Sequence, residues 1–285
     1  MMIAVASGKG GTGKTSVATN LACNAGRPVL YADCDVEEPN AHIFFDGQLV
    51  SEETASLTIP VFDLDKCNGC SACADFCQFN ALAMVEEHPL LFPELCHGCG
   101  GCLKSCPHDA VREEPSRIGS ITTIRSGDIT LMTGRLDIGN ARASSLVHIL
   151  RNRLPHGTTT ILDAPPGTAC QTVATLRGVD YVVLVTEPTP FGLHDLKLAV
   201  ALARALQLPF GVVINRNGSG DDRVHRYCTE ESIAVLLEIP DDRRIAEAYS
   251  QGEMITRVLP EYQARFRDLW RQIDQQLAAS RSDGH

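Results

Sequence analysis

Short apolar runs recur along the chain, and most of them are followed by a segment whose apolar residues have helical spacing. Such runs are typical of strands buried on both faces of a sheet, and strands separated by helices indicate parallel pairing. The pattern therefore predicts an α/β fold with a doubly wound, mostly parallel sheet. The predicted strands are residues 2–6, 28–33, 158–163, 181–186, 210–214 and 235–239, and the predicted helices include residues 145–154 and 193–206.

Three other segments have patterns of their own. Residues 43–45 are a short apolar run that predicts a strand, and alternation on both sides of Ser126 and Gly127 indicates a hairpin. Residues 260–279 predict a helix with balanced charges around its apolar stripe. Because a helix that lies on a membrane carries a basic polar face, we expect this one to dock on the sheet. Its stripe consists of Tyr262, Phe266, Leu269, Ile273 and Leu277.

Charge and composition exclude several classes of function. The net charge of the 285-residue chain is −10 and no basic block is present, which argues against nucleic acid or an anionic membrane as the partner. No apolar run approaches the roughly 18 residues that span a bilayer. The N-terminus lacks the pattern of a signal peptide, so the twelve cysteines are expected to stay reduced in a cytoplasmic protein.

A glycine-rich loop, GKGGTGKT at residues 8–15, lies between the first predicted strand and a predicted helix. In this context G-x-x-x-x-G-K-S/T binds phosphate, because backbone N–H groups and the positive end of the helix face the anion. Lys14 is placed to reach the β- and γ-phosphates, and Thr15 to hold Mg²⁺. We predict a nucleotide site built from Gly10, Gly11, Thr12, Gly13, Lys14, Thr15 and Ser16.

Acidic residues follow two other predicted strands. Asp33 and Asp35 end the second strand, and Asp163 ends another before a Pro165-Pro166-Gly167 turn. The carboxyl ends of parallel strands share one rim of the sheet, so these carboxylates are expected near the phosphate loop, where they can meet Mg²⁺ or a water. For residues 33–40, a solvated acidic loop without a ligand stays open as an alternative.

Eight cysteines form two runs with the spacing of bacterial ferredoxins, in which three cysteines bind one [4Fe-4S] cluster and the fourth binds the other. The flanks repeat as well, so the window is an internal duplication of about 29 residues. Zinc is the alternative, although it favours paired C-x₂-C knuckles. The expected ligand sets are Cys67, Cys70, Cys73 and Cys106 for one cluster and Cys77, Cys96, Cys99 and Cys102 for the other.

The chain is thus expected to consist of a nucleotide-binding domain, residues 1–59 and 116–285, and an inserted ferredoxin-like α+β domain, residues 60–115. In the first cysteine run, Gln78 stands where proline is usual. Because that proline shapes a turn and binds no metal, cluster binding does not depend on it.

The loop with Lys9 after Gly8 resembles the deviant Walker A loop of the MinD/ParA class, which includes the nitrogenase iron protein. Asp33-x-Asp35-x₄-Asn40 resembles the first switch of that class, and Asp163-x-Pro165-Pro166-Gly167 its second. Residues 186–196 also read like the class. With the cysteine-rich insertion, nearly the whole chain is similar to MinD-superfamily ATPases that contain an inserted ferredoxin domain.

The resemblance implies ATP or ADP with Mg²⁺ as ligands and a dimer that ATP holds together, either a homodimer or a heterodimer with a related ATPase. Lys9 would reach the phosphates of the partner, Asp35 would position or activate the attacking water, and Asp163 would support the Mg²⁺ shell. Asn215 would hydrogen-bond the adenine, and the backbone around Pro240 would flank it. Switch residues would be Asn40, Pro166 and Gly167.

Cys170 lies seven residues after Asp163, the offset of a cluster-binding cysteine in the nitrogenase iron protein. Two copies could meet at a dimer interface and hold a metal. The segment around residues 139–141 offers no second cysteine, and a buried structural thiol is the alternative.

Three functions compete. The first is an ATPase switch that couples nucleotide state to electron transfer from two clusters to a redox partner. The second is an ATP-dependent carrier that delivers a cluster or metal to an acceptor protein. The third is a positioning ATPase like MinD or ParA, which the acidic charge and the balanced C-terminal helix disfavour.

Overall fold

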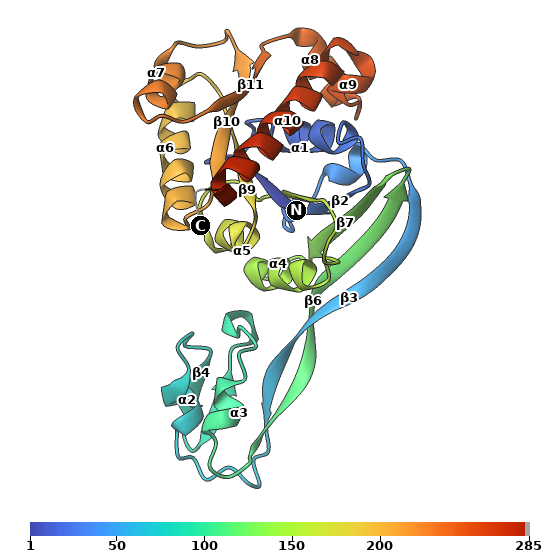
Figure 1. Cartoon of the computed structure of the whole chain (residues 1–285). Helices are drawn as coiled ribbons and strands as arrows, with labels where there is room; N and C mark the ends of the chain where they lie inside the picture. Colours follow the sequence, from blue (N-terminus) through green and yellow to red (C-terminus); the bar gives the residue numbers. More distant parts are fainter. Residues whose placement is uncertain (283–285) are drawn as a thin grey trace.

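A computed structural model describes residues 1–282 of the chain, with side chains up to residue 278. Within these residues, nine strands form one sheet in the order β11-β10-β9-β1-β8-β2-β7-β6-β3. Figure 1 shows this sheet with the helices around it. The strands from β11 to β7 are parallel, and β6 and β3 add an antiparallel edge. Their bounds are β1 Met2–Ala6, β2 Val29–Asp33, β3 Gln48–Phe62, β6 Val111–Ser126, β7 Ile129–Leu136, β8 Thr160–Asp163, β9 Tyr181–Thr186, β10 Phe210–Asn217 and β11 Val235–Pro240.

Helices cover both faces of the sheet, as predicted. Alternate residues of β1 point to opposite sides, so Ile3 and Val5 pack in one apolar layer and Ala4 and Ala6 in the other. The first layer contains α1 (Lys14–Cys23), α9 (Ile255–Val258) and α10 (Glu261–Ser282); α8 (Arg243–Ser250) contacts α9. The second contains α4 (Ala143–Asn152), α5 (Cys170–Leu176), α6 (Pro190–Ala205) and α7 (Arg223–Glu230).

The C-terminal helix docks on the sheet, which confirms the prediction from its stripe. All five apolar residues of the stripe are buried in the first layer. The indole nitrogen of Trp270 donates a hydrogen bond of 2.7 Å to the carbonyl of Leu21, which ties α10 to α1. No helix within residues 1–282 is long and apolar enough to cross a bilayer.

The two irregular segments have different outcomes. The predicted hairpin is present: β6 and β7 are antiparallel, and Ser126 pairs with Ile129 next to the turn. Gly127 in this turn has a φ of 58°. The predicted strand at residues 43–45 is wrong: η1 (Ala41–Ile43) is a 3₁₀-helix there. Phe44 and Phe45 are buried against the first layer, so the apolar run serves packing rather than sheet pairing.

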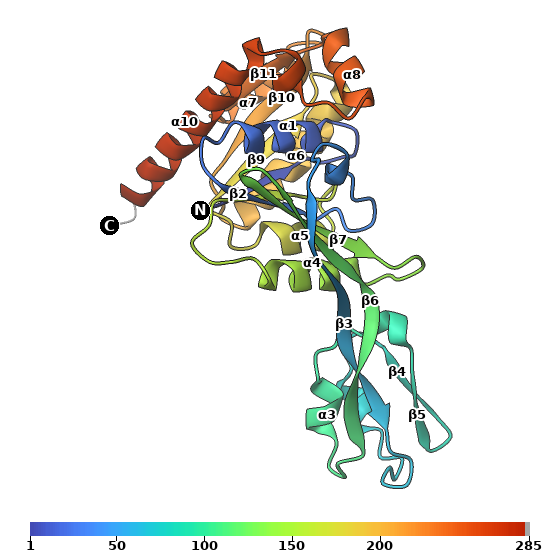
Figure 2. The same cartoon turned by 90° about the vertical axis from the view of Figure 1, so that its right-hand side faces the viewer.

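A long ribbon made of β3 and β6 carries the cysteine-rich segment away from the large sheet (Figures 1 and 2). The two strands pair from Gln48 and Arg125 to Phe62 and Val111, whereas pairing of β6 with β7 ends at Gly119 and Leu136. β3 therefore runs from the sheet to the cysteine-rich module, and β6 runs back from the module to the sheet. The module contains α2 (Ala72–Phe76), β4 (Leu82–Val85), β5 (His88–Leu91), η2 (Pro93–Leu95) and α3 (Gly101–Ser105).

The 29-residue duplication is visible in the backbone of the module. Positive φ angles occur in pairs 29 positions apart: Gly69 with Gly98, Ser71 with Gly100, and Asn80 with Asp109. The amides of Ala81 and Ala110, another such pair, donate hydrogen bonds of 3.4 Å to the sulfurs of Cys77 and Cys106. The halves therefore share the same cysteine-loop geometry.

Candidate functional site

The glycine-rich loop connects β1 to α1, which begins at Lys14. Gly13 has a φ of 89°, a conformation that favours glycine, and the amide group of Asn215 occupies the space that its Cβ would need. The Asn215 amide donates a hydrogen bond of 2.9 Å to the carbonyl of Thr12. A side chain of β10 (Phe210–Asn217) thus supports the loop.

A pocket of about 400 Å³ lies over this loop at the carboxyl ends of the parallel strands. Most predicted nucleotide residues line it: Gly10, Gly11, Gly13, Lys14, Thr15, Ser16, Asp35, Asn40, Pro166, Asn215 and Pro240. The rest of the wall consists of Glu38, Arg216, Asp241, Asp242, Ile245, Ala246 and Tyr249, which the sequence did not single out. Thr12 and Asp163 are buried beneath the pocket, and neither Lys9 nor Gly167 is part of its wall.

Asp163 is buried and has one carboxylate oxygen free. Its Oδ2 accepts a hydrogen bond of 2.9 Å from the hydroxyl of Tyr31, and its Oδ1 has no hydrogen-bond partner among the described residues. Burial raises the pKa of Asp163, while the Thr15 hydroxyl, the Lys14 charge and the Tyr31 hydroxyl lower it. An unpaired carboxylate oxygen beside a threonine hydroxyl fits Mg²⁺, which takes one or two protein oxygens and completes its shell with water and phosphate.

Asp33 organises the loop that follows β2, a role that sequence spacing did not reveal. Its Oδ1 accepts from the amide of Asp35 at 3.2 Å, and its Oδ2 accepts from the amides of Asn40 and Ala41 at 3.1 and 3.0 Å. Asp33 is fully buried and pairs in register with Asp163. Burial, with the neighbouring Asp163 charge, raises the pKa of Asp33 to about 8.

Asp35 faces the pocket at the start of this loop. Burial raises its pKa to about 6; the Lys14 charge opposes the shift, and the Asp163 charge adds to it. A carboxylate with a pKa near neutral can accept a proton or orient a water at physiological pH.

Lys9 is not part of the pocket wall and pairs with a glutamate of its own chain. Its amino group lies 3.5 Å from Oε2 of Glu187, and the other oxygen of Glu187 accepts a hydrogen bond of 2.7 Å from Arg216. Lys9 is therefore held by its own chain. Cys170, the first residue of α5, is exposed, so the alternative of a buried thiol is wrong for this chain on its own.

The other cysteines outside the module are packed in the core. Cys34 and Cys228 are buried, which raises the pKa of each thiol. Cys23 is half-buried, and its thiol lies 2.9 Å from the sulfur of Met254.

The cysteine-rich module contains two small cavities, each lined by four cysteines. Apolar side chains complete both walls: Phe62, Met84 and Val111 line the first cavity, and Leu82 and Leu91 line the second. The groups are the two that the spacing predicts: Cys67, Cys70, Cys73 and Cys106 line the first cavity, and Cys77, Cys96, Cys99 and Cys102 the second.

The donor set of each cavity fits an iron–sulfur cluster, whose ligands are four thiolates in an apolar surrounding. A single zinc ion, with Zn–S bonds of about 2.3 Å, would instead need four sulfurs within about 4 Å of one another. Within residues 1–282, no three histidine, cysteine or acidic side chains are grouped to hold one metal ion.

The two cavities differ in their surroundings despite the duplication. Phe76 and Phe79 line the second cavity, and the Phe79 ring stacks on His97 at 4.0 Å between centroids. The equivalent positions 29 residues later are Ser105 and His108. The second cavity is therefore bordered by Phe76, Phe79 and His97, whereas the first is bordered by Phe62 and His108.

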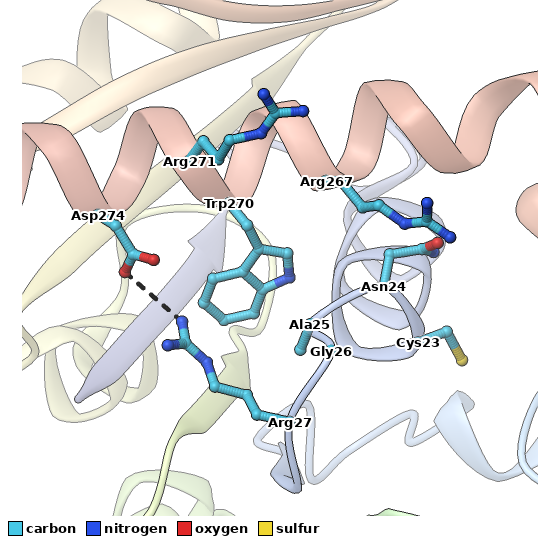
Figure 3. A pocket seen from close by; sticks show the side chains of 9 residues that line it. All are labelled: Cys23, Asn24, Ala25, Gly26, Arg27, Arg267, Trp270, Arg271 and Asp274. Atoms are coloured by element: carbon cyan, nitrogen blue, oxygen red, sulfur yellow. Dashed lines mark hydrogen bonds and ion pairs between the residues drawn. The ribbon is translucent and has the colours of Figure 1, made fainter.

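A further hollow of about 410 Å³ lies at the far end of α1 (Figure 3). Arg27 pairs with Asp274 at 3.5 Å and covers the ring of Trp270, while Arg271 pairs with Asp268. Its positive groups do not converge on one point, so the hollow does not have the geometry of an anion site.

The comparisons with known proteins agree with the loop and the sheet. The model of the CobQ/CobB/MinD/ParA nucleotide-binding domain matches residues 3–255. The chain belongs to this family. It is a P-loop ATPase of the MinD/ParA type.

Three similar proteins come from Methanocaldococcus jannaschii. Two uncharacterized proteins are 29% identical over 261 residues, covering 89% of this chain and 90% of the relative, and 32% identical over 225 residues, covering 76% and 79%. An uncharacterized ATP-binding protein is 25% identical over 258 residues, covering 87% and 77%.

Solved MinD structures share the fold. The septum site-determining protein MinD with Mg-ADP, from Pyrococcus horikoshii, has a TM-score of 0.59 at 20% identity, covering 96% of both chains. The MinC:MinD cell division complex of Aquifex aeolicus has a TM-score of 0.56 at 15% identity, again covering 96% of both chains. At these identities the likeness concerns the fold alone.

Proposed function

We propose that the protein is an ATP-driven dimeric switch that carries two [4Fe-4S] clusters and couples its nucleotide state to electron transfer to a partner protein. One observation carries the proposal: two apolar cavities, each lined by four cysteines, are joined by a paired ribbon to the sheet that holds a P-loop nucleotide site.

On the nucleotide side, the loop from Gly10 to Ser16 binds the phosphates through its backbone, and Lys14 neutralises the β- and γ-phosphates. Thr15 and Asp163 would hold Mg²⁺, which supplies charge neutralisation when bound. Asp35 orients the attacking water and accepts its proton. The side-chain NH₂ group of Asn215 donates to the Thr12 carbonyl, so the side-chain oxygen of Asn215 is left to accept a hydrogen bond from the adenine amino group. Pro240 would flank the adenine. The likeness to a MinD structure with Mg-ADP supports these ligands.

On the cysteine side, the clusters would supply one-electron chemistry, and the chain holds and tunes them. The amides of Ala81 and Ala110 donate to Cys77 and Cys106, one sulfur of each set, and such bonds stabilise thiolate charge. In this proposal, residues 60–115 act as an inserted ferredoxin domain between the two parts of the ATPase domain, residues 1–59 and 116–285.

The dimer forms when Lys9 leaves Glu187 and reaches the phosphates bound to the partner subunit, while Asn40, Pro166 and Gly167 follow the γ-phosphate as switch residues. Cys170, exposed at the carboxyl rim of the sheet, would then lie near the interface. If Cys170→Ala leaves metal content and ATP-dependent dimerisation unchanged, Cys170 has no part in this interface.

Iron analysis after anaerobic reconstitution tests the cluster sets. We expect about eight iron atoms per chain, about four in Cys99→Ala, and about eight in the matched control Cys228→Ala, which alters a buried thiol outside the module. Equal iron in Cys99→Ala and the parent protein would contradict the assignment.

A second candidate function is delivery of a cluster to an acceptor protein. Cys70 and Cys99, one cysteine of each set, are exposed, so an acceptor thiolate could reach a ligand of either cluster. Iron that moves to an apo-acceptor on addition of ATP would favour delivery, whereas electron transfer with iron retained would favour the redox switch.

A further inference from the structure

Leu136 and Asp137 lie at the end of β7 and contact two other segments. One is the Asp35–Val36 loop at the nucleotide pocket, and the other is the root of the β3–β6 ribbon, residues 54–58 and 116–119, where the ribbon leaves the sheet. Their two amides point in different directions: Leu136 donates to the carbonyl of Val36 at 2.8 Å, and Asp137 donates to the carbonyl of Ile118 at 2.9 Å. Two successive peptide groups therefore bridge the pocket loop and the ribbon.

On the pocket side, Val36 follows Asp35, which lines the pocket. The Val36 side chain is buried, and a Cβ on Gly134 would lie only 2.8 Å from its Cγ1. Because Asp33 also holds the amides of this loop, the loop is packed as a unit. If Asp35 moves, Val36 has to move with it, and the end of β7 follows because Leu136 is hydrogen-bonded to Val36.

On the ribbon side, Arg117 clamps Asp137. Its Nε donates to Oδ2 of Asp137 at 2.9 Å, and its Nη2 donates to Oδ1 at 3.2 Å, a bidentate pair. The third guanidinium nitrogen of Arg117, Nη1, donates to the hydroxyl of Thr54 on β3 at 3.3 Å. One side chain thus joins β3, β6 and the end of β7.

The clamp lies at the point where the ribbon leaves the sheet. The register of β3 and β6 shifts between Ala55 and Ser56, opposite Ile118, and the pairing of β6 with β7 ends one residue away at Gly119. Bulges bend and twist a strand pair. Beyond this root, β3 and β6 pair only with each other, as far as Phe62 and Val111. Each of these two residues is five positions from the nearest cysteine, Cys67 or Cys106.

We propose that Leu136 and Asp137 relay the position of the Asp35–Val36 loop to the ribbon, so that nucleotide state sets the orientation of the cysteine-rich module. The relay rests on the nucleotide half of the proposed function. It does not depend on whether the cysteines hold clusters.

Hydrogen exchange of the full, anaerobically purified chain tests the relay, with Mg-ADP and with a slowly hydrolysed Mg-ATP analogue. In the parent protein, root amides of residues 54–58 and 116–119 should exchange at rates that differ about two- to fivefold between the two nucleotides, the range that an exposed ion-pair clamp supports. Arg117→Gln should bind both nucleotides as the parent does and lose this difference. The matched control is Arg112→Gln, which breaks the Arg112–Glu114 pair of 3.1 Å farther along the same strand; it should keep the difference.

Three results would overturn the relay: root amides that exchange alike in both nucleotides, an Arg117→Gln variant that keeps the difference, or loop residues 8–16 that neither nucleotide protects. The last result would also remove the nucleotide half of the proposed function. A chain that binds no iron but shows the predicted exchange would refute the cluster proposal and leave the relay standing.

Discussion

The hydroxyl of Tyr31 donates a hydrogen bond of 2.9 Å to Oδ2 of Asp163, and Oδ1 of the same carboxylate has no hydrogen-bond partner within the part of the chain that the structure describes. Both side chains are buried in the middle of the parallel sheet. The tyrosine therefore fixes the plane of the carboxylate and leaves one oxygen for a cation beside Thr15.

Tyr31→Phe tests this arrangement. Loss of one hydrogen bond, about 1 kcal/mol, should lower the affinity for Mg-ADP roughly fivefold, because the carboxylate is no longer oriented. Affinity for ADP measured with EDTA should not change. Titration calorimetry with and without Mg²⁺ gives both values. Tyr181→Phe is the matched control, a buried sheet tyrosine whose hydroxyl contacts Gln276. Equal losses with and without Mg²⁺ would contradict the orienting role.

Stability without nucleotide should fall as the pH rises. Burial is the main cause that raises the pKa of Asp33 to about 8 and that of Asp35 to about 6, whereas aspartates in an unfolded chain titrate near about 3.9. The folded protein therefore binds more protons between these values. The resulting stabilisation is complete below about pH 4 and is lost as the pH passes 6 and then 8.

Urea unfolding of the nucleotide-free protein at several pH values measures this loss. In Asp163→Asn the neighbouring charge is absent, so the pKa of Asp33 falls and the difference in unfolding free energy between pH 6 and pH 8 becomes smaller. Histidines affect the parent and the variant alike. The same slope in both proteins would show that Asp33 and Asp163 do not interact as their burial implies.

The ion pair between Lys9 and Glu187 should oppose dimer formation. Glu187→Gln releases Lys9, and we expect the dimer dissociation constant with a slowly hydrolysed ATP analogue to fall about two- to fivefold, the range for a partly exposed pair. Lys9→Ala should abolish nucleotide-dependent dimerisation. Sedimentation velocity measures both. Arg216→Gln, which removes only the second partner of Glu187, is the control and should not tighten the dimer. A Lys9→Ala variant that dimerises like the parent would refute the role of Lys9.

The two clusters should have different reduction potentials. Reduction adds negative charge, and the aromatic side chains around the second cavity exclude the water that would stabilise it. Phe79→Ser should therefore raise one midpoint potential by tens of millivolts and leave the other unchanged in a redox titration followed by EPR. Leu90→Ser, at an exposed apolar residue of the same module outside both cavity walls, should change neither. One shared potential in the parent protein would contradict the asymmetry.

The sequence predicted most of the sheet, because the parallel strands are buried on both faces and read as apolar runs. It did not predict β3, whose residues from Gln48 to Thr54 are mostly exposed and so lack an apolar period. The apolar run at residues 43–45 wrongly predicts a strand, because short apolar runs look alike in a strand and in a buried turn.

The phosphate loop and the grouping of the cysteines follow from local spacing, which the sequence states directly. The role of Asp33 does not, because it depends on amides up to eight residues away that fold back onto one carboxylate. The pairing of Lys9 with Glu187 likewise joins segments distant in sequence, so spacing could not reveal it.

An EPR-monitored redox titration of the reconstituted protein tests the central claim, coupling between nucleotide and cluster, most directly. It is performed anaerobically with Mg-ADP and with a slowly hydrolysed Mg-ATP analogue, in the parent protein and in Lys14→Ala. We predict that cluster potentials or spectra differ between the two nucleotides in the parent and not in the variant. Intact clusters with identical signals in both nucleotide states, at concentrations where both nucleotides are bound, would contradict the account.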